Sequence, residues 1–329
     1  MSKVLCFGEV LLRFSPNVNS FNDAAMPFYV GGAELNVAMA LSKWDIPVGY
    51  CTAMPSNFLS KEIAAFIASK KIDTSAIQYS GDRIGSYFLA QGKDMKNDSV
   101  VFDRVGSSFS TLQLGETNWK QIFKEVGWFH ISAIAASLTQ NVADVCEEAM
   151  AVAKSLGIPI SIDLNYRPKL WKYGKLPIDI IPKLVSYCDF LMGNMWAVEK
   201  MLGIPCDIID SEASSKEALI IAATNSIDKL KINFPTVKTV AYTFRLETTY
   251  YALLHQNENH YISKEHTMDA VIDKVGSGDC FMAGLLYGTL NKLIPIETVN
   301  FAAAAAVGKL YEKGDATSQT ITQIKKRYT

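Results

Sequence analysis

The stretch Asp273-Lys274-Val275-Gly276-Ser277-Gly278-Asp279 carries the strongest local signal in this chain of 329 residues. An apolar run, Cys280-Phe281-Met282-Ala283-Gly284-Leu285-Leu286, follows at once and is typical of a buried helix. Two glycines at a helix start allow successive backbone N–H groups to converge on an anion, and the helix dipole adds to that attraction. The pattern therefore predicts an anion hole, formed by Gly276, Ser277 and Gly278, that can hold a transferring phosphoryl group.

Asp279 falls in the first turn of this predicted helix. From there its carboxylate can take the proton of a hydroxyl group that attacks a phosphate held in the anion hole. An acidic residue at this position also caps a helix, and the motif by itself does not separate the two interpretations.

Outward from this motif, predicted strands alternate with predicted helices along most of the chain. Short apolar runs indicate strands, and longer amphipathic runs indicate helices. This alternation is typical of a parallel, doubly wound sheet covered by helices, which is an α/β fold. The expected strands are 4–7, 48–52, 128–132, 158–162, 190–192 and 239–243, and the expected helices follow Gly32 and span 60–69, 142–155, 197–202 and 278–290.

Two segments, approximately 11–30 and 84–105, interrupt the alternation. They contain extended-type residues such as Tyr87-Phe88-Leu89 and Val100-Val101-Phe102, without a helical pattern. We expect them to form a small β-sheet placed over the main sheet as a lid. Because no Pro-rich or Gly-rich linker, charge block or internal repeat divides the chain, we expect residues 1–329 to form a single domain.

Polar residues occur at several predicted element ends. Asp163-Leu164-Asn165-Tyr166-Arg167 follows an apolar strand, at the edge where a parallel sheet displays ligand-binding residues. Gly31-Gly32-Ala33-Glu34-Leu35-Asn36 leads into a helix, and Arg104 ends a predicted lid strand. Each feature alone is equally typical of an ordinary polar loop or a surface cation.

Composition excludes several classes of function. Lys and Arg total 32 against 33 Asp and Glu, a net charge of -1, so the chain lacks the broad cationic field of a nucleic-acid or anionic-membrane binder. Its six cysteines are spread singly, which indicates reduced thiols. No apolar run reaches the ~18 residues of a membrane span, and the start lacks a secretory pattern. We expect a cytoplasmic protein with no nucleic-acid or membrane partner.

Several catalytic motifs are absent from the sequence. It contains no His-Glu-x-x-His, no Gly-x-x-x-x-Gly-Lys-[Ser/Thr], and no Gly-x-Gly-x-x-Gly after the first predicted strand. A zinc hydrolase, a P-loop ATPase and a Rossmann dehydrogenase are therefore disfavoured.

The motifs Gly31-Gly32-x-x-x-Asn36, Asp163-x-Asn165-x-Arg167 and Asp273-x-x-Gly276-x-Gly278-Asp279, in this order, resemble the ribokinase-like family of carbohydrate kinases. The resemblance covers essentially the whole chain. Within that family, Gly8-Glu9, Arg13-Phe14-Ser15-Pro16, Phe102-Asp103-Arg104 and the Asp163 motif look most like 2-keto-3-deoxygluconate kinases. The resemblance implies a three-layer α/β/α sandwich with a small β-sheet lid.

The resemblance also implies an ATP-dependent, Mg²⁺-using kinase that phosphorylates the terminal hydroxyl of 2-keto-3-deoxygluconate or a related 2-keto-3-deoxy sugar acid. It gives Asp279 the role of base. The positions it places against the sugar acid are Gly32, Asn36, Tyr87, Phe102, Arg104, Arg167 and Asp279. The positions it places against the nucleotide are Asp163, Asn165, Arg167, Thr243, Arg245, Gly276 and Gly278. Two arginines suit a carboxylate, which they can hold by charge-assisted hydrogen bonds.

The chain departs from the family pattern at three places. One is Leu246-Glu247-Thr248-Thr249, which follows the strand that carries Thr243 and lacks the glycine expected there. Phe102 stands where the subfamily usually has a tyrosine, and it cannot donate a hydroxyl hydrogen bond. After Gly193-Asn194 the family typically supplies acidic residues that organise Mg²⁺, whereas here only Glu199 remains. Asn194 and Glu199 are therefore the candidate metal residues.

Two other functions remain open at this point. A kinase of the same fold could act on a neutral sugar such as fructose or ribose. The two arginines distinguish a sugar-acid kinase from that alternative, because a neutral sugar has no carboxylate for them to hold. A sugar-binding or nucleotide-binding protein that has lost catalysis is the second, and the retained Asp279 and anion hole argue against it. Because an exposed lid sheet has unpaired edges and an apolar face, we also expect a homodimer formed through the lid.

Overall fold

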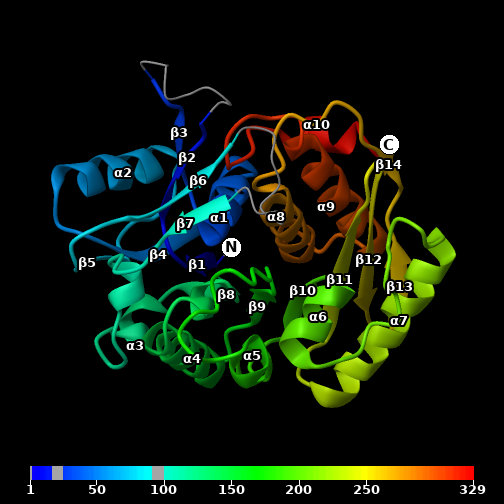
Figure 1. The fold of residues 1–329 in the computed structure, drawn as a ribbon, viewed down its shortest axis with the longest axis horizontal. Coiled ribbons are helices and arrows are strands. Elements are labelled where there is room, and N and C mark those ends of the chain that lie inside the picture. Colours follow the sequence, from blue (N-terminus) through cyan, green and yellow to red (C-terminus); the bar gives the residue numbers. More distant parts are fainter. Residues whose placement is uncertain (1, 17–24, 91–99) are drawn as a thin grey trace.

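The computed structural model describes residues 2–16, 25–90 and 100–329. Its main feature is a ten-stranded sheet in the order β13-β12-β11-β10-β9-β8-β1-β4-β5, with β14 paired to β12 (Figure 1). These strands are β1 (Lys3–Phe7), β4 (Val48–Met54), β5 (Ile77–Tyr79), β8 (Val126–Ser132), β9 (Ile160–Asp163), β10 (Phe190–Gly193), β11 (Thr239–Arg245), β12 (Thr249–Gln256), β13 (Asn259–Ile262) and β14 (His266–Thr267).

Helices cover both faces of this sheet, each over its own apolar core. Alternate residues of β1 serve the two cores: Leu5 and Phe7 belong to one, and Val4 and Cys6 belong to the other. The first core packs α3 (Trp119–Ile122), α4 (Gln140–Ser155), α5 (Pro177–Val185), α6 (Met195–Leu202) and α7 (Lys216–Asn233). The second packs α1 (Ala33–Lys43), α2 (Phe58–Ser69), α8 (Ser277–Leu290), α9 (Pro295–Lys309) and α10 (Ile321–Lys325). The predicted three-layer α/β/α architecture is confirmed.

The expectation of a wholly parallel sheet is wrong at one edge. From β11 to β5 the neighbouring strands run parallel. β12 instead runs antiparallel to β11, and β13 and β14 run antiparallel to β12. Residues 246–248 alone join β11 to β12, and a parallel crossover needs a dozen residues or more. The short connection therefore forces a hairpin, which the sequence analysis missed along with α5, α7 and α9.

A separate four-stranded sheet is formed by the two segments that interrupt the alternation. Its order is β3-β2-β6-β7, from β2 (Leu11–Phe14), β3 (Phe28–Gly31), β6 (Gly85–Leu89) and β7 (Val100–Asp103). The predicted small sheet is thus present, while parts of both predicted lid segments, 17–24 and 91–99, lie outside the described residues. Its pleat turns alternate residues to opposite faces, so Arg13 and Tyr87 are buried while Phe88 is exposed.

Buried ion pairs join this small sheet to the rest of the molecule. The Arg13 guanidinium lies 2.7 Å from Asp273 Oδ2 and 2.7 Å from Asp315 Oδ1. The Tyr87 hydroxyl donates a hydrogen bond of 3.1 Å to Asp315 Oδ2. These four side chains come from two strands of the small sheet and from the segments that flank α8 and α9, so the network links three regions distant in sequence.

Helices α8 and α9 run side by side and approach each other closely at Gly284 (Figure 1). A Cβ atom at Gly284 would lie 2.6 Å from the Cα atom of Ala302 on α9. Only glycine allows this backbone contact without movement of one helix. Because α8 begins at the anion-hole motif, this packing also determines where that motif lies. No helix in the described part of the chain combines the length and the apolar character of a membrane span.

We predict that Gly284→Ala lowers the free energy of unfolding by about 1–3 kcal/mol, because the added methyl group overpacks the contact with α9. Urea denaturation followed by circular dichroism measures the change. Asn225→Ala, on the exposed face of α7, serves as the control and should change stability by less than about 0.5 kcal/mol. A Gly284→Ala protein as stable as the wild type would mean that α8 and α9 have room to spare.

Candidate active site

A pocket of about 530 Å³ opens where the carboxyl ends of β9, β10 and β11 meet the starts of α1 and α8. Parallel sheets bind ligands at this edge. The small sheet closes another side through Leu11, Tyr87 and Phe102. The predicted site residues that line the pocket are Gly32, Asn36, Tyr87, Phe102, Arg104, Asp163, Asn165, Arg167, Asn194, Thr243, Arg245, Gly276, Ser277, Gly278 and Asp279.

The turn at Gly276 forms the N-terminus of α8. Gly276 is the N-cap and has φ 77°, a left-handed conformation. A Cβ atom there would lie 1.9 Å from the carbonyl oxygen of Asp315, so no other residue fits. The Ser277 hydroxyl donates a hydrogen bond of 3.0 Å to the carbonyl of Ala306. Ser277 can therefore bind an anion through its backbone N–H and not through its hydroxyl. The unsatisfied amides of this helix start can therefore bind a phosphate.

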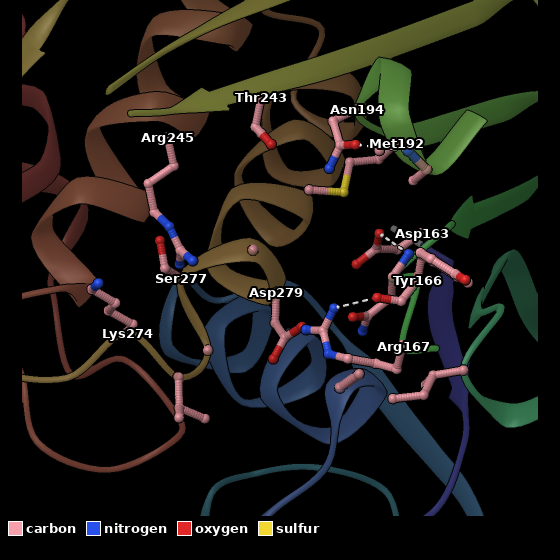
Figure 2. Close-up of a pocket in the computed structure, with 18 of the residues that line it drawn as sticks. Asp163, Tyr166, Arg167, Met192, Asn194, Thr243, Arg245, Lys274, Ser277 and Asp279 are labelled. Atoms are coloured by element: carbon pink, nitrogen blue, oxygen red, sulfur yellow. Dashed lines mark hydrogen bonds between the residues drawn. The ribbon is translucent and has the colours of Figure 1, made fainter. Parts of the chain in front are cut away.

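Asp279 lies in the first turn of α8 and lines the pocket, with its side chain partly buried. Asn36 Nδ2 on α1 donates a hydrogen bond of 2.7 Å to Asp279 Oδ2. Burial raises the pKa of Asp279 to about 7, and the nearby Asp163 adds to that rise, whereas Asn36 and Arg167 oppose it. Figure 2 shows the side chains of Arg167 and Asp279 pointing toward each other. A carboxyl group with this pKa can accept and release a proton near neutral pH.

The loop after β9 is bent so that Arg167 reaches the pocket. Asp163 Oδ1 accepts a hydrogen bond of 3.0 Å from the backbone N–H of Asn165. Asn165 has φ 34°, in the left-handed region that asparagine tolerates better than most residues. Arg167 Nη1 donates to the carbonyl of Tyr166 at 2.9 Å (Figure 2). Burial also raises the pKa of Asp163 to about 6.

Arg104 is a buried cation that lines the pocket and is only 4% exposed. Its Nε is paired with the carboxylate of Glu9, which also accepts a hydrogen bond from the Ser107 hydroxyl. Arg104 Nη1 has no hydrogen-bond partner within the described part of the protein, and neither does Oδ1 of Asn36. Buried polar groups without partners are costly. These two atoms are therefore available to acceptor and donor groups of a ligand.

The structure does not bring Glu199 to this pocket. Glu199 Oε1 accepts the backbone N–H of Cys206 at 3.2 Å, and Oε2 pairs with Lys200 at 3.3 Å. Asn194 does line the pocket, but its Oδ1 caps α6 by accepting the N–H of Ala197 at 2.8 Å. Among residues 2–16, 25–90 and 100–329, no group of three or more His, Cys, Asp or Glu could hold a metal ion. A dedicated metal cage is thus absent from the part that is described.

Several residues of the pocket were missed by the sequence analysis. They include Tyr166, Met192, Trp196, Lys200, Tyr250 and Lys274. Lys200 could have been found, because it follows Asn194 and Ala197 at helical spacing of three. Five cationic side chains line the pocket, against two carboxyl groups. The pocket is thus positively charged although the chain is not, which suits anionic ligands.

Comparisons with known proteins agree with this geometry. The family model described as pfkB family carbohydrate kinase matches residues 1–322. The crystal structure of 2-dehydro-3-deoxygluconokinase from Thermotoga maritima has a TM-score of 0.90 and 30% identity, covering 100% of this chain and 99% of that one. The 2-dehydro-3-deoxygalactonokinase of Haloferax volcanii is 24% identical over 331 residues, 99% of this chain and 96% of its own.

A more distant structure shares the fold and carries a nucleotide. The fructokinase of Xylella fastidiosa with bound ATP has a TM-score of 0.78 and 19% identity, covering 98% of this chain and 97% of its own. The family model spans nearly the whole sequence, and the pocket contains the glycine turn and the carboxyl group expected of a phosphoryl-transfer site. The chain is a member of the pfkB family of carbohydrate kinases.

Proposed function

We propose that this protein is an ATP-dependent kinase that phosphorylates the terminal hydroxyl of 2-keto-3-deoxygluconate or a related 2-keto-3-deoxy sugar acid. The observation that carries the proposal is Arg104, a buried guanidinium that lines the pocket with an unpartnered Nη1. A carboxylate is the acceptor that best matches such a donor. The relatives from Thermotoga maritima and Haloferax volcanii, whose names specify kinases of 2-keto-3-deoxy sugar acids, support the same class of substrate.

In the proposed complex the sugar acid lies between the small sheet and α1. Arg104 and Arg167 hold its carboxylate, and Asn36 Oδ1 accepts a hydrogen bond from a sugar hydroxyl. Phe102 and the ring of Tyr87 supply apolar contact, because the Tyr87 hydroxyl is bonded to Asp315. This arrangement leaves the terminal hydroxyl for Asp279.

The proposed reaction transfers the γ-phosphoryl group in one displacement. Asp279 takes the proton of the terminal hydroxyl as its oxygen attacks the γ-phosphorus, and the bond from phosphorus to the ADP oxygen breaks. The amides of residues 276–278 bind the oxygens of the phosphoryl group and stabilise the charge that shifts onto them. Asp279 afterwards releases its proton to solvent. The small sheet acts as a lid that keeps out water, the competing acceptor.

The nucleotide is proposed to occupy the other half of the pocket. Its contacts would come from Asp163, Asn165, Arg167, Thr243, Arg245, Gly276 and Gly278. Mg²⁺ keeps most of its waters and binds through phosphates and one or two protein oxygens. Asp163 lines the pocket and would offer such an oxygen, whereas Oδ1 of Asn194 already accepts the N–H of Ala197. When bound, Mg²⁺ neutralises negative charge on the phosphates. We propose the cytoplasm as the location, because ATP is supplied there.

We predict that Asp279→Asn lowers kcat by at least ~10²-fold while ATP still binds, since the amide cannot accept the proton. Because burial raises the pKa of Asp279 to about 7, the wild-type carboxyl group is protonated and inactive below that pH. The wild-type kcat/KM should therefore rise about tenfold per pH unit up to neutrality and level off above it. A coupled ADP-release assay measures both. Asp228→Asn, an exposed carboxylate on α7, is the control; a variant at 279 with nearly full activity would remove Asp279 from the mechanism.

We predict that Arg104→Gln raises KM for 2-keto-3-deoxygluconate by roughly ten- to a hundredfold, from the loss of a charged hydrogen bond. Fructose should be a poor substrate of the wild type, and the variant should not change its rate. Arg83→Gln, an exposed arginine that pairs with Asp103, serves as the matched control. Steady-state kinetics on 2-keto-3-deoxygluconate, its 2-keto-3-deoxygalactonate epimer and fructose provide the test. Equal losses on the acids and on fructose would favour a neutral-sugar kinase, and no turnover of any sugar would favour a binding protein.

We further propose that the lid pairs two copies of this chain. Four apolar side chains of the small sheet lie in one register row on its outer face: Phe28, Phe14, Phe88 and Val101. The rings of Phe14 and Phe88 stack at 5.1 Å, and Val101 is 61% exposed. Exposed apolar rows of this kind are typical of interfaces. A second copy can cover the row by a symmetric contact.

Val101→Asp should convert a dimer to a monomer, because it buries a charge within that apolar contact. Light scattering coupled to gel filtration gives the mass of each form. Ile232→Asp, which replaces a 79% exposed side chain on α7, should leave the dimer intact. A monomeric wild type, or a dimer insensitive to Val101→Asp, would contradict this assembly.

A further inference from the structure

Lys309, the last residue of α9, is a fully buried lysine. Its side chain is 0% exposed, and lysine is almost never found in such a position without compensating partners. The ammonium group donates a hydrogen bond of 3.2 Å to the backbone carbonyl of Glu312. Burial lowers the pKa of Lys309, and the negative charges of Asp273, Glu312 and Asp315 oppose that shift. A cation is thus maintained inside the protein at some cost in desolvation, which calls for a function.

Lys309 lies directly behind the anion hole. Its Cε atom is 3.3 Å from the point where a Cβ of Gly276 would stand, and the carbonyl oxygen of Asp315 is 1.9 Å from the same point. Lys309 does not line the pocket, so it touches the turn from the protein side. The ammonium therefore acts on the turn and not on a ligand.

Hydrogen bonds join the segment after α9 to the anion-hole motif. Asp273 Oδ1 accepts the N–H of Val275 at 3.0 Å, and Asp273 Oδ2 accepts the N–H of Gly314 at 3.3 Å. The backbone N–H groups of Ile272 and Asp273 donate to the carbonyl of Leu310. The segment 310–315 is thus pressed against the turn at Gly276, with two buried carboxylates, Asp273 and Asp315, in the contact.

Positive charges at this contact offset part of the negative charge of Asp273, Glu312 and Asp315. Arg13 is placed between Asp273 and Asp315, so one guanidinium faces two carboxylates. The Lys309 ammonium supplies the second positive charge and also binds the backbone carbonyl of Glu312. Without it, a buried negative charge would lie behind an anion hole that must bind phosphate, and repulsion would weaken that binding.

We propose that Lys309 is a positioning residue whose ammonium serves as a built-in cation behind the anion hole. It binds the carbonyl of Glu312 and so holds the segment after α9 against Gly276, which keeps the amides of residues 276–278 aimed at the phosphoryl group. Because this position is already filled by a tethered cation, the wild-type enzyme needs no free monovalent cation there. The inference rests on phosphoryl transfer at this pocket and is independent of which sugar is the acceptor.

The test compares Lys309→Ala with the wild type in buffers whose cation is choline, potassium or ammonium at equal ionic strength. In choline, the variant should lose about 10²-fold in kcat, since small misplacements of catalytic groups have effects of this size. KM for the sugar should change less than threefold, because the sugar subsite is untouched. Potassium or ammonium should raise the kcat of this variant at least tenfold above its value in choline, because these ions can enter the space that the lysine side chain leaves. Choline is too large to enter, which makes it the matched negative control.

Two controls separate this role from a general loss of structure. Lys154→Ala, at the end of α4 and paired with Asp189 at the surface, should leave kcat unchanged in all three buffers. Lys309→Met keeps the bulk of the side chain and should be folded but slow, without rescue, because the space remains filled. A Lys309→Ala protein that is fully active in choline, or whose lost rate no small cation restores, would overturn the proposal.

The wild type alone gives a further test that does not depend on any variant folding. Its rate should vary less than twofold among the three cations, and a tenfold activation by potassium would overturn the inference. The melting temperature of Lys309→Ala should rise in potassium or ammonium relative to choline, whereas that of the wild type should not. If no sugar acid is phosphorylated, the proposed substrate class fails, while the melting comparison still decides the role of Lys309.

Discussion

The ion pairs of Arg13 with Asp273 and Asp315 are the interaction on which the arrangement of this protein depends. All three side chains are buried, and the guanidinium lies 2.7 Å from each carboxylate. A buried charge that loses its partner destabilises a protein by about 3–5 kcal/mol. The lid strand β2, the start of the anion-hole motif and the segment after α9 must therefore come together in one geometry. The same geometry places Tyr87 and Phe102 of the small sheet against the pocket.

Burial raises the pKa of the carboxyl groups in the site, whereas the arginines there stay charged. The carboxyl groups of Asp163 and Asp279 are raised in pKa to about 6 and about 7, so they exchange protons near neutral pH. Arginine stays charged in any protein environment, and Arg104 retains an unpartnered nitrogen. One pocket thus combines a titratable base with permanent cations. This combination suits the transfer of a phosphoryl group to an acid substrate, where binding needs fixed positive charge and catalysis needs a mobile proton.

The residues of the site could be predicted in part from short motifs whose geometry is local and in part from the resemblance to the ribokinase-like family. A glycine turn before an apolar helix already implies converging amides, and Asp279 follows at a fixed distance from them. Motif reasoning did not show which way a charged side chain is held. Glu199 has the right charge, but Cys206 and Lys200 bind it away from the pocket. The hairpin of β11 and β12 was missed because only its first strand was expected, at 239–243, and the apolar run of β12 can be filled by either element type.

The sequence by itself determined the class of fold, the glycine turn before α8 and the place of Asp279 in its first turn, since hydrophobic periodicity and motif spacing act over a few residues. The two arginines were assigned through the family resemblance. Only the tertiary structure decided which side of each motif faces the pocket. It turned the Ser277 hydroxyl and the Tyr87 hydroxyl away from the pocket, toward Ala306 and Asp315. It also placed the Lys309 ammonium behind Gly276, a position that no local sequence pattern predicts. Which charges compensate one another in a protein interior depends on which groups meet in space. Their positions along the sequence do not show which groups will meet.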